Sequence, residues 1–353
     1  MKRLLVLVTT LALLAAAALV TGAGAPARAA DGDTTVTLVT HDSFAVSKQV
    51  LRSFTKRTGI RVKILRAGDA GSALNQMILT KDNPVGDVFF GVDNTFLSRA
   101  LDADVFEPYA PKALASVPPE YQLDTTGHLT PIDRGDVCIN VDKKWFAREN
   151  LPVPATLSDL IDERYEGTLV VENAATSSPG LAFVLATIAR FGEDGWRDYW
   201  QDLRDNGVLV VDDWTVAFEG NFSQGGGSGT RPLVVSYASS PPVAVHFSDP
   251  QPATSPIGTM LDSCFQQVEF AGVLRGTEHR REARAVVDFM LSKRFQEDIP
   301  LQMFVFPVRE GSALPPVFEK FAEVAPDPLS LPPAEIGANR DEWIEQWTET
   351  VLR

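Results

Sequence analysis

Alternating apolar and polar positions predict that the chain opens with three strands separated by two helices. Strands are expected at 36–40 and 60–65, where the two kinds of residue alternate, and at 88–90, which is continuously apolar. The segments 42–57 and 72–82 repeat their apolar residues at helical spacing. This β-α-β-α-β order predicts an α/β fold in which helices cover a parallel sheet.

The rest of the chain is predicted to continue with short strands and helices. A proline-rich stretch, 313–333, is expected to wrap over a surface, and the glycine run 225–229 is expected to form a flexible surface loop. Strands are predicted at 136–141, 168–171, 208–211 and 233–236, helices at 157–161, 181–191, 196–203, 281–291 and 335–351, and a short apolar segment at 268–275.

Two tryptophans lie one helical turn apart in the last predicted helix. Trp343 and Trp347 have i,i+4 spacing, which places both side chains on one helix face. Such a pair more often docks a helix on the core than contacts a ligand. We therefore expect residues 335–351 to pack against the body of the protein.

The first thirty residues have the three parts of a secretory signal peptide. They are the basic pair Lys2-Arg3, the apolar run 4–20, and a small-x-small cleavage site at 27–29. The apolar run is too short for a stable membrane span, and no cysteine lies nearby to accept a lipid. We therefore expect residues 1–29 to be removed and the protein to be exported, periplasmic or extracellular, soluble and without a lipid anchor.

The mature chain is expected to be strongly acidic. About 320 residues remain after cleavage, enough for two domains with separate cores. Without Lys2, Arg3 and Arg28, 29 basic residues remain of 32, against 46 acidic ones, so the net charge is about −17. Such a surface repels nucleic acid and anionic membranes, and it favours a cationic or small neutral ligand.

The chain has two cysteines, Cys138 and Cys264. An oxidising compartment permits one disulfide, but two separate buried thiols explain the pair equally well. The four histidines have no metal-type spacing, which argues against a zinc site. We expect neither a metal nor a cofactor.

The motifs of several enzyme classes are missing from the sequence. It has no Gly-x-Ser-x-Gly and no phosphate-binding loop, and no histidine has a recognisable partner for a serine nucleophile. We therefore expect a binding protein and not an enzyme. A secreted hydrolase, with a nucleophile or carboxylate pair assembled in a cleft, is the alternative from another class. A sensor's ligand domain is a third class, but no membrane span or signalling module follows it.

Polar turns follow several predicted strands, at the end where open α/β sheets bind ligands. The turn 176–180 begins a helix, so its hydroxyls and free N–H groups suit an anion, although ordinary N-capping explains them too. Trp214 follows two aspartates and could hold a cation or fill the core. The other turns are 41–44, 68–72, 91–94 and 236–241.

In their order and spacing these turns resemble the periplasmic thiamine-binding proteins of ABC importers. The resemblance covers nearly the whole mature chain. Its pieces are Asp42-Ser43-Phe44, Asp69 through Asn75, Val92-Asp93-Asn94, Thr176 through Leu181, Ser236-Tyr237 with Ser239-Ser240-Pro241, Gln267-Val268-Glu269, and Phe295 through Val308.

The resemblance implies a two-lobe, periplasmic-binding-protein-like fold of type II, with a ligand cleft between the lobes. Lobe one would hold 31–134 and 265–308, and lobe two 138–262 and 309–353. The protein would be a monomer that binds a small molecule, thiamine or its phosphates, and delivers it to an ABC permease. On these boundaries both cysteines fall next to the crossovers, and we hypothesise that a Cys138–Cys264 disulfide staples the hinge strands.

The resemblance also assigns ligand-binding residues by position. The thiazolium cation is expected among aromatic rings and Asp69, and a phosphate at the hydroxyl turn. The family's usual tyrosine and tryptophan are replaced by His41 and Phe304, which stack more weakly, and a protonated His41 would repel a thiazolium. The full expected set is Asp69, Ala70, Ser177, Ser178, Trp214, Tyr237, Ala238, Ser239, Ser240, His41 and Phe304.

Because of these two departures, another organic cation, such as a polyamine, stays open as the ligand. Ferric iron is less favoured, since iron sites of this fold typically need adjacent tyrosines. Here Tyr237 is followed by Ala238.

Overall fold

The structure is a computed structural model that describes residues 34–353. The predicted signal peptide, residues 1–29, lies outside the described residues. Within 34–353, none of the helices combines the length and the apolar character that a membrane span requires.

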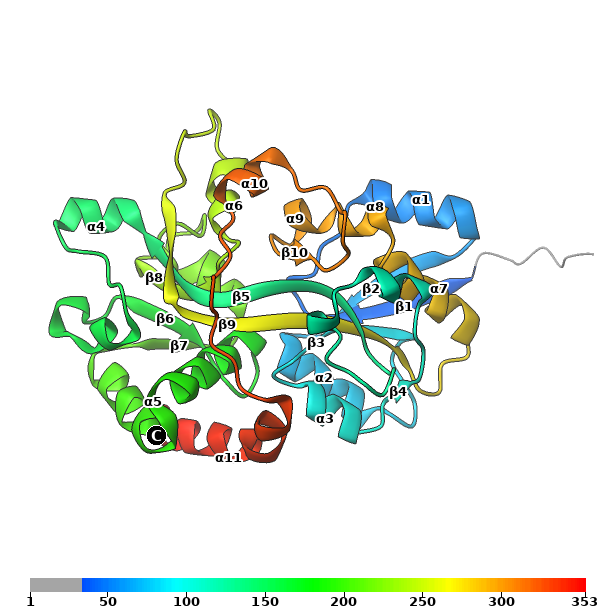
Figure 1. Cartoon of the computed structure of the whole chain (residues 1–353), viewed down its shortest axis with the longest axis horizontal. Helices are drawn as coiled ribbons and strands as arrows, with labels where there is room; N and C mark the ends of the chain where they lie inside the picture. The colour runs from blue at the N-terminus through cyan, green and yellow to red at the C-terminus, as the bar shows by residue number, and fades with distance from the viewer. Residues whose placement is uncertain (1–33) are drawn as a thin grey trace, which may run out of the picture. The chain divides into compact units, whose positions relative to one another are not determined.

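One mixed sheet of ten strands runs through the described part of the chain (Figure 1). Its main path has the order β2-β1-β3-β9-β5-β8-β6-β7, while β4 pairs with β9 and β10 pairs with β5. The strands are β1 (Thr35–Thr40), β2 (Arg61–Arg66), β3 (Val88–Asp93), β4 (Phe106–Glu107), β5 (Thr130–Asp142), β6 (Leu169–Glu172), β7 (Leu209–Val211), β8 (Leu233–Tyr237), β9 (Ile257–Leu274) and β10 (Phe306–Pro307).

The two longest strands, β5 and β9, connect the two halves of this sheet. They pair antiparallel from Thr130 opposite Ala271 to Asp142 opposite Ile257. In the first half β1 pairs parallel with β2 and β3, and in the second half β6 pairs parallel with β7 and β8. The predicted α/β fold with parallel strands is therefore confirmed, and it is built as two halves around a shared antiparallel pair.

Helices cover both faces of the sheet (Figure 1). Their bounds are α1 (Lys48–Thr58), α2 (Ala70–Leu79), α3 (Leu97–Asp102), α4 (Lys143–Glu149), α5 (Ser178–Asp205), α6 (Pro241–His246), α7 (Arg280–Met290), α8 (Lys293–Gln296), α9 (Ile299–Gln302), α10 (Pro316–Phe321) and α11 (Pro333–Val351). Short 3-10 turns lie at Lys112–Ser116, Pro119–Tyr121, Leu157–Ile161 and Glu163–Tyr165, and a π-helical segment lies at Thr215–Asn221.

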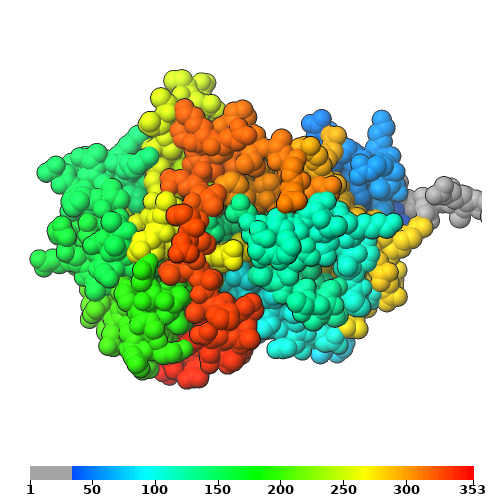
Figure 2. Space-filling model, in the orientation of Figure 1, coloured from blue at the N-terminus to red at the C-terminus, as the bar shows by residue number. Residues whose placement is uncertain are grey.

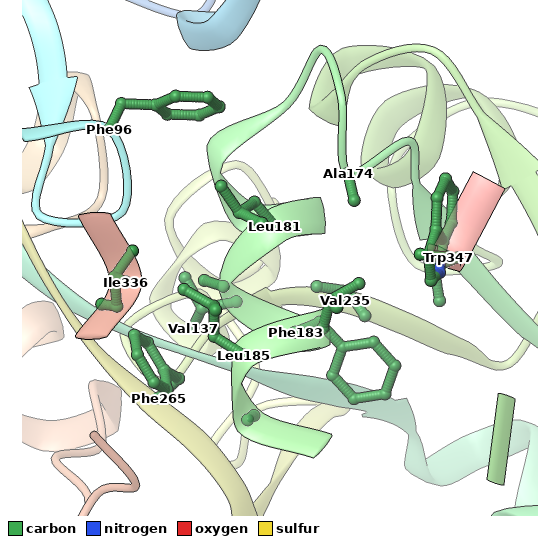
Figure 3. Packing of buried hydrophobic residues seen from close by; sticks show 14 of the residues in the cluster. Phe96, Val137, Ala174, Leu181, Phe183, Leu185, Val235, Phe265, Ile336 and Trp347 are labelled. Carbon is green, nitrogen blue, oxygen red and sulfur yellow. The ribbon is translucent and has the colours of Figure 1, made fainter. Parts of the chain in front are cut away.

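The larger core lies where α2, α5 and α11 pack on one face of the sheet. Figure 3 shows Leu181, Phe183 and Leu185 of α5 with Ile336 and Trp347 of α11 in this core. The Trp347 ring meets Trp200 edge to face, with 5.6 Å between the ring centroids. Trp343 and Trp347 are both buried, which confirms the predicted docking of the last helix. A second core lies on the opposite face, beneath α1 and α7.

Residues 322–332 cross the two connecting strands before α11 begins (Figure 2). The Leu329 N–H donates to the Cys264 carbonyl at 2.7 Å, and the Gln266 N–H donates to the Leu329 carbonyl at 3.0 Å. The expected wrapping of the proline-rich stretch over a surface is therefore confirmed. Beyond it, α11 packs against α5 of the second half and α3 of the first.

Several predicted boundaries were wrong, because side-chain caps set the true starts of the helices. The first helix begins at Lys48 and not at 42, since the Ser47 hydroxyl accepts the Val50 N–H. The second begins at Ala70 and not at Ser72, because Asp69 caps it. By contrast, the predicted helices 181–191 and 196–203 are confirmed as two helical segments within α5, because Gly192, with φ of 72° and ψ of 174°, interrupts the helix between them.

Two further segments take part in more tertiary packing than their local sequence pattern indicates. The predicted segment 268–275 is the end of an 18-residue strand, whose polar residues, such as Asp262 and Gln266, hid its length. The glycine run 225–229 forms a surface loop, as expected, with residues 226–228 exposed, but Gly225 packs against the segment Thr215–Asn221. A Cβ at Gly225 would lie 1.6 Å from the Phe218 carbonyl oxygen, so only glycine fits there.

Cys138 of β5 and Cys264 of β9 form a disulfide, which ties the connecting strands together. Both residues are buried, and Ala238 and Ala325 pack around them. The two cysteines are 126 residues apart in the sequence, so the bond closes a long loop in the unfolded chain.

Replacing both cysteines by alanine should lower the free energy of unfolding by about 2–4 kcal/mol, because the unfolded chain regains the entropy of that loop. Urea unfolding at neutral pH measures the loss. Wild-type protein in a strong reductant should unfold at nearly the same urea concentration as the double variant. An unchanged midpoint in both samples would show that the bond contributes nothing.

Candidate functional site

A pocket of about 460 Å³ lies at the ends of strands from both halves of the sheet. The first half contributes the turn after β1, the end of β2 and the loop after α9, and the second half contributes the segment after β7 and the turn after β8. Four of the expected ligand residues line it: Trp214, Tyr237, Ser240 and Phe304. Sequence reasoning missed other lining side chains, chiefly Phe44, Arg66, Phe218, Phe247 and Met303.

Trp214 is held as one wall of the pocket. Its indole N–H donates to the Ser236 hydroxyl at 3.0 Å, and its ring stacks on Phe218 with 5.0 Å between the centroids and 11° between the planes. The sequence left open whether this tryptophan fills the core or faces a ligand. It is partly buried and lines the pocket, so one face of a fixed indole is available to a cation.

Asp69 joins the two halves of the sheet behind this wall. One carboxylate oxygen accepts the Ala70 N–H at 2.7 Å, and the other accepts the Trp214 N–H at 3.2 Å. Nearby, the Thr176 carbonyl accepts the Gly71 N–H at 3.0 Å. A Cβ at Gly71 would lie 2.8 Å from that carbonyl oxygen, so glycine permits the close approach. The acidic turn therefore contacts two loops of the second half.

Burial raises the pKa of Asp69 to about 6, although hydrogen bonds from Ser177, Ala70 and Trp214 act in the opposite direction. The charge of Asp213 raises it further. The carboxyl group consequently titrates near the pH at which the protein is expected to work.

The hydroxyl turn lies deeper than the pocket. Ser177 and Ser178 are buried at the start of α5, and the Ser178 hydroxyl accepts the Gln267 side-chain N–H at 3.1 Å. The carboxyl groups of Asp69 and Glu172 lie close to this helix start. The pocket wall does not include either serine. The Asp69 carboxylate, which is ionised above its pKa of about 6, therefore disfavours an anion at this helix start, despite the free N–H groups.

His41 is buried behind Phe44, and its ring contacts Phe90 with 5.4 Å between the centroids. Its Nδ1 lies 2.9 Å from the Ser43 hydroxyl, and its Nε2 lies 3.5 Å from a carboxylate oxygen of Glu269. Burial, helped by the charge of Arg66, lowers the pKa of His41 to about 4. The imidazole is therefore neutral at ordinary pH, and the expected repulsion of a cationic ligand applies only in strong acid.

Phe304 lies at the mouth of the pocket, in a left-handed backbone conformation with φ of 56°. Its ring lies 5.8 Å from that of Phe247, which is 72% exposed, and 6.0 Å from that of His246. A bulky residue rarely adopts this conformation without support from its surroundings. The three rings bring together α6 of the second half and the loop after α9 of the first.

The remaining expected residues lie behind the pocket. Ala70 is buried at the start of α2, and Ala238 packs against the disulfide. Ser239 is fully buried, and its hydroxyl has no hydrogen-bond partner in the described part of the chain.

Buried carboxyl groups surround the inner side of Tyr237, and the sequence reasoning did not select them. Asp133 and Glu269 face each other across β5 and β9, and Glu172 ends β6. Burial raises the pKa of all three, and for Glu269 the charge of Asp133 adds to the effect. A usable signal was present in the sequence, because an acidic residue inside an apolar strand, such as Glu269 between Val268 and Phe270, is costly unless it has a role.

Residues 83–327 match the family of bacterial extracellular solute-binding proteins. The chain belongs to this family. The thiamine-binding periplasmic protein of Escherichia coli (strain K12) is 29% identical over 323 residues, which cover 90% of this chain and 94% of that protein. A protein of the same name from Brucella suis biovar 1 is 27% identical over 93% of this chain and 95% of its own length.

Solved structures agree with the assignment of this chain to the solute-binding proteins. A periplasmic thiamin binding protein superimposes with a TM-score of 0.77 at 26% identity, covering 90% of this chain and 96% of that one. Iron-bound HitA from Pseudomonas aeruginosa has a TM-score of 0.71 at 23% identity, covering 90% and 99%, and shows the fold alone. The expected two-lobe periplasmic-binding-protein fold is confirmed. Among residues 34–353, no group of histidine, cysteine and acidic side chains is arranged to hold a metal ion.

The ligand-free Asp69→Asn variant should show a flatter dependence of stability on pH. Because the folded pKa of Asp69 is raised, its contribution to stability is complete below about pH 4 and is lost as the pH rises to about 6. Between pH 3 and 7 the wild type should lose about 3 kcal/mol relative to the variant, at 1.36 kcal/mol per pKa unit. Urea unfolding at several pH values measures this difference. Parallel curves for the two proteins would contradict the raised pKa.

Proposed function

We propose that this solute-binding protein captures thiamine or thiamine phosphates outside the cytoplasm and delivers them to the membrane permease of an ABC importer. The observation that carries the proposal is the cleft itself, an aromatic pocket backed by buried carboxyl groups. Aromatic faces and nearby acids favour an organic cation that carries flat rings. The thiamine-binding relatives, similar over nine-tenths of the chain, support thiamine as that cation.

Within the pocket, we place the thiazolium ring against the open face of Trp214 and beside Tyr237, with Phe304 at the mouth. Asp69, Ala70, His41, Ser177, Ser178, Ala238, Ser239 and Ser240 complete the proposed site, and most of them shape it from behind. Arg66 is the basic side chain among the described residues of the wall. A phosphate on the ligand would lie near Arg66, because the start of α5 is crowded by carboxyl groups.

Ligand capture would occur by closure of two lobes. We propose that lobe one holds 31–134 and 265–308 and that lobe two holds 138–262 and 309–353. The connecting strands β5 and β9 would act as the hinge, and the contacts of Asp69 with Trp214 and of Gly71 with Thr176 would form on closure. Closure would shift a pre-existing equilibrium by the ligand's preference for the closed state.

The proposal involves no chemical step. The protein would act as an exported monomer without a lipid anchor, a cofactor or catalysis. The second candidate is the same cleft binding a different organic cation, such as a polyamine, because His41 and Phe304 offer less stacking than the family's usual residues.

Isothermal titration calorimetry of refolded, ligand-stripped protein against thiamine, its two phosphate esters and spermidine tests the proposal. Thiamine or one of its esters should bind in a one-to-one ratio and more tightly than spermidine. Tighter binding of spermidine would favour the second candidate. No heat and no thermal shift with any of the three thiamine compounds would refute the thiamine assignment.

The Trp214→Ala variant should weaken thiamine binding about tenfold, because it removes the stacking face of the pocket. Trp145→Ala is the matched control, since Trp145 packs on Phe146 in α4 and is not part of the pocket wall. Titration calorimetry of both variants measures the two affinities. Equal affinities for Trp214→Ala and the wild type would remove this tryptophan from the site.

A further inference from the structure

The carboxyl groups behind Tyr237 form a cluster drawn from four strands and the turn after a fifth. Asp133 lies on β5, Glu269 on β9, Asp93 on β3 and Glu172 on β6, and Asp69 follows β2. Asp133 and Glu269 are directly opposite each other in the register of β5 and β9, and they are 0% and 7% exposed. Two carboxylates held this close in a buried place cannot both be ionised at neutral pH without a compensating cation.

The groups that face this cluster supply little positive charge to compensate ionised carboxylates. His41 presents an Nε2 that has no hydrogen-bond partner and lies 3.5 Å from Glu269, and this imidazole is neutral. Asp93 is satisfied by Thr95 and Gln267, whereas neither oxygen of Glu172 has a hydrogen-bond partner. Asp213 adds a further acid near Asp69 and Glu172, and Arg66 lies exposed at the outer rim.

Tyr237 separates this cluster from the pocket. Its phenol ring lines the pocket and also lies against β5, because a Cβ at Gly135, two residues from Asp133, would be 3.0 Å from the ring. Burial, with a further contribution from Glu269, raises the pKa of this phenol. A cation placed against Tyr237 would therefore lie one ring away from the acids, in surroundings where charges are weakly screened. Its attraction would favour the ionised form of the nearest carboxyl group.

We propose that the cleft exchanges a proton for its cationic ligand: the Asp133–Glu269 pair holds a proton in the empty protein and releases it when the organic cation binds against Tyr237. The proton passes to the solvent, and the bound cation replaces its charge, so the exchange is balanced. This inference rests on the proposed function, and it adds that acid weakens binding. Burial, which raises the pKa of both members of the pair, supports it.

The test is titration calorimetry with unphosphorylated thiamine at pH 7 in PIPES and in Tris, which differ strongly in ionisation enthalpy. The phosphate esters are avoided because their own phosphate titrates near this pH. The binding enthalpies in the two buffers should differ by an amount that corresponds to release of about one proton. By linkage, the dissociation constant should rise by up to about tenfold per unit as the pH falls from 8 to 6.

Glu269→Gln and Asp133→Asn keep the shape of the pair and remove its shared titration. Each should reduce the proton release and flatten the pH dependence, a change that a merely structural role would not produce. Glu107→Gln is the matched control, because Glu107 on β4 is also buried but pairs with Arg280 of α7, and it lies outside the pocket wall. Its proton release should equal that of the wild type.

The possible results distinguish proton exchange from the proposed function. If thiamine binds with the same enthalpy in both buffers and with a flat pH profile, proton exchange is refuted while the proposed function stands. If the wild type releases a proton and both pair variants release it equally, the assignment to Asp133 and Glu269 is overturned. If thiamine does not bind at all, the proposed function fails and this inference fails with it. The pH dependence of thiamine binding to the wild type decides whether a proton is exchanged, even if one variant does not fold.

Discussion

The antiparallel pairing of β5 with β9 is the constraint on which the rest of the structure depends. These two strands belong to both halves of the sheet, so their register fixes how the turns of one half meet the turns of the other. The disulfide and residues 322–332 hold the same pair together from the side. Because the strands run through both halves, they set the two halves on either side of the pocket.

The same pairing explains the electrostatics of the cleft. It places Asp133 opposite Glu269 in the interior, where ionised carboxyl groups are unfavourable unless a positive charge compensates them. An aromatic wall of Trp214, Tyr237 and Phe304 lies between these acids and the solvent. A cation with flat rings satisfies both features at once, and this is the physical reason why we propose thiamine as the ligand.

Much of the fold could be predicted from the sequence because the first strands and helices carry clean periodic patterns. The cleft residues Trp214, Tyr237, Ser240 and Phe304 were also found, since they lie in turns whose order resembles a known family. The length of β9 was underestimated, because its first half mixes apolar and polar residues without strict alternation and its partners are remote in sequence. The carboxyl pair was missed because Asp133 and Glu269 are also remote in sequence, and only the register of β5 and β9 brings them together.

The most direct test of the central claim is a crystal structure of the protein with thiamine bound. We predict that the thiazolium ring lies against Trp214 and Tyr237, on the outer side of the buried carboxyl groups, with the two halves of the sheet closed around it. Thiamine bound elsewhere, for example in the surface groove beside Lys144 and Pro250, with the aromatic pocket empty, would contradict this account.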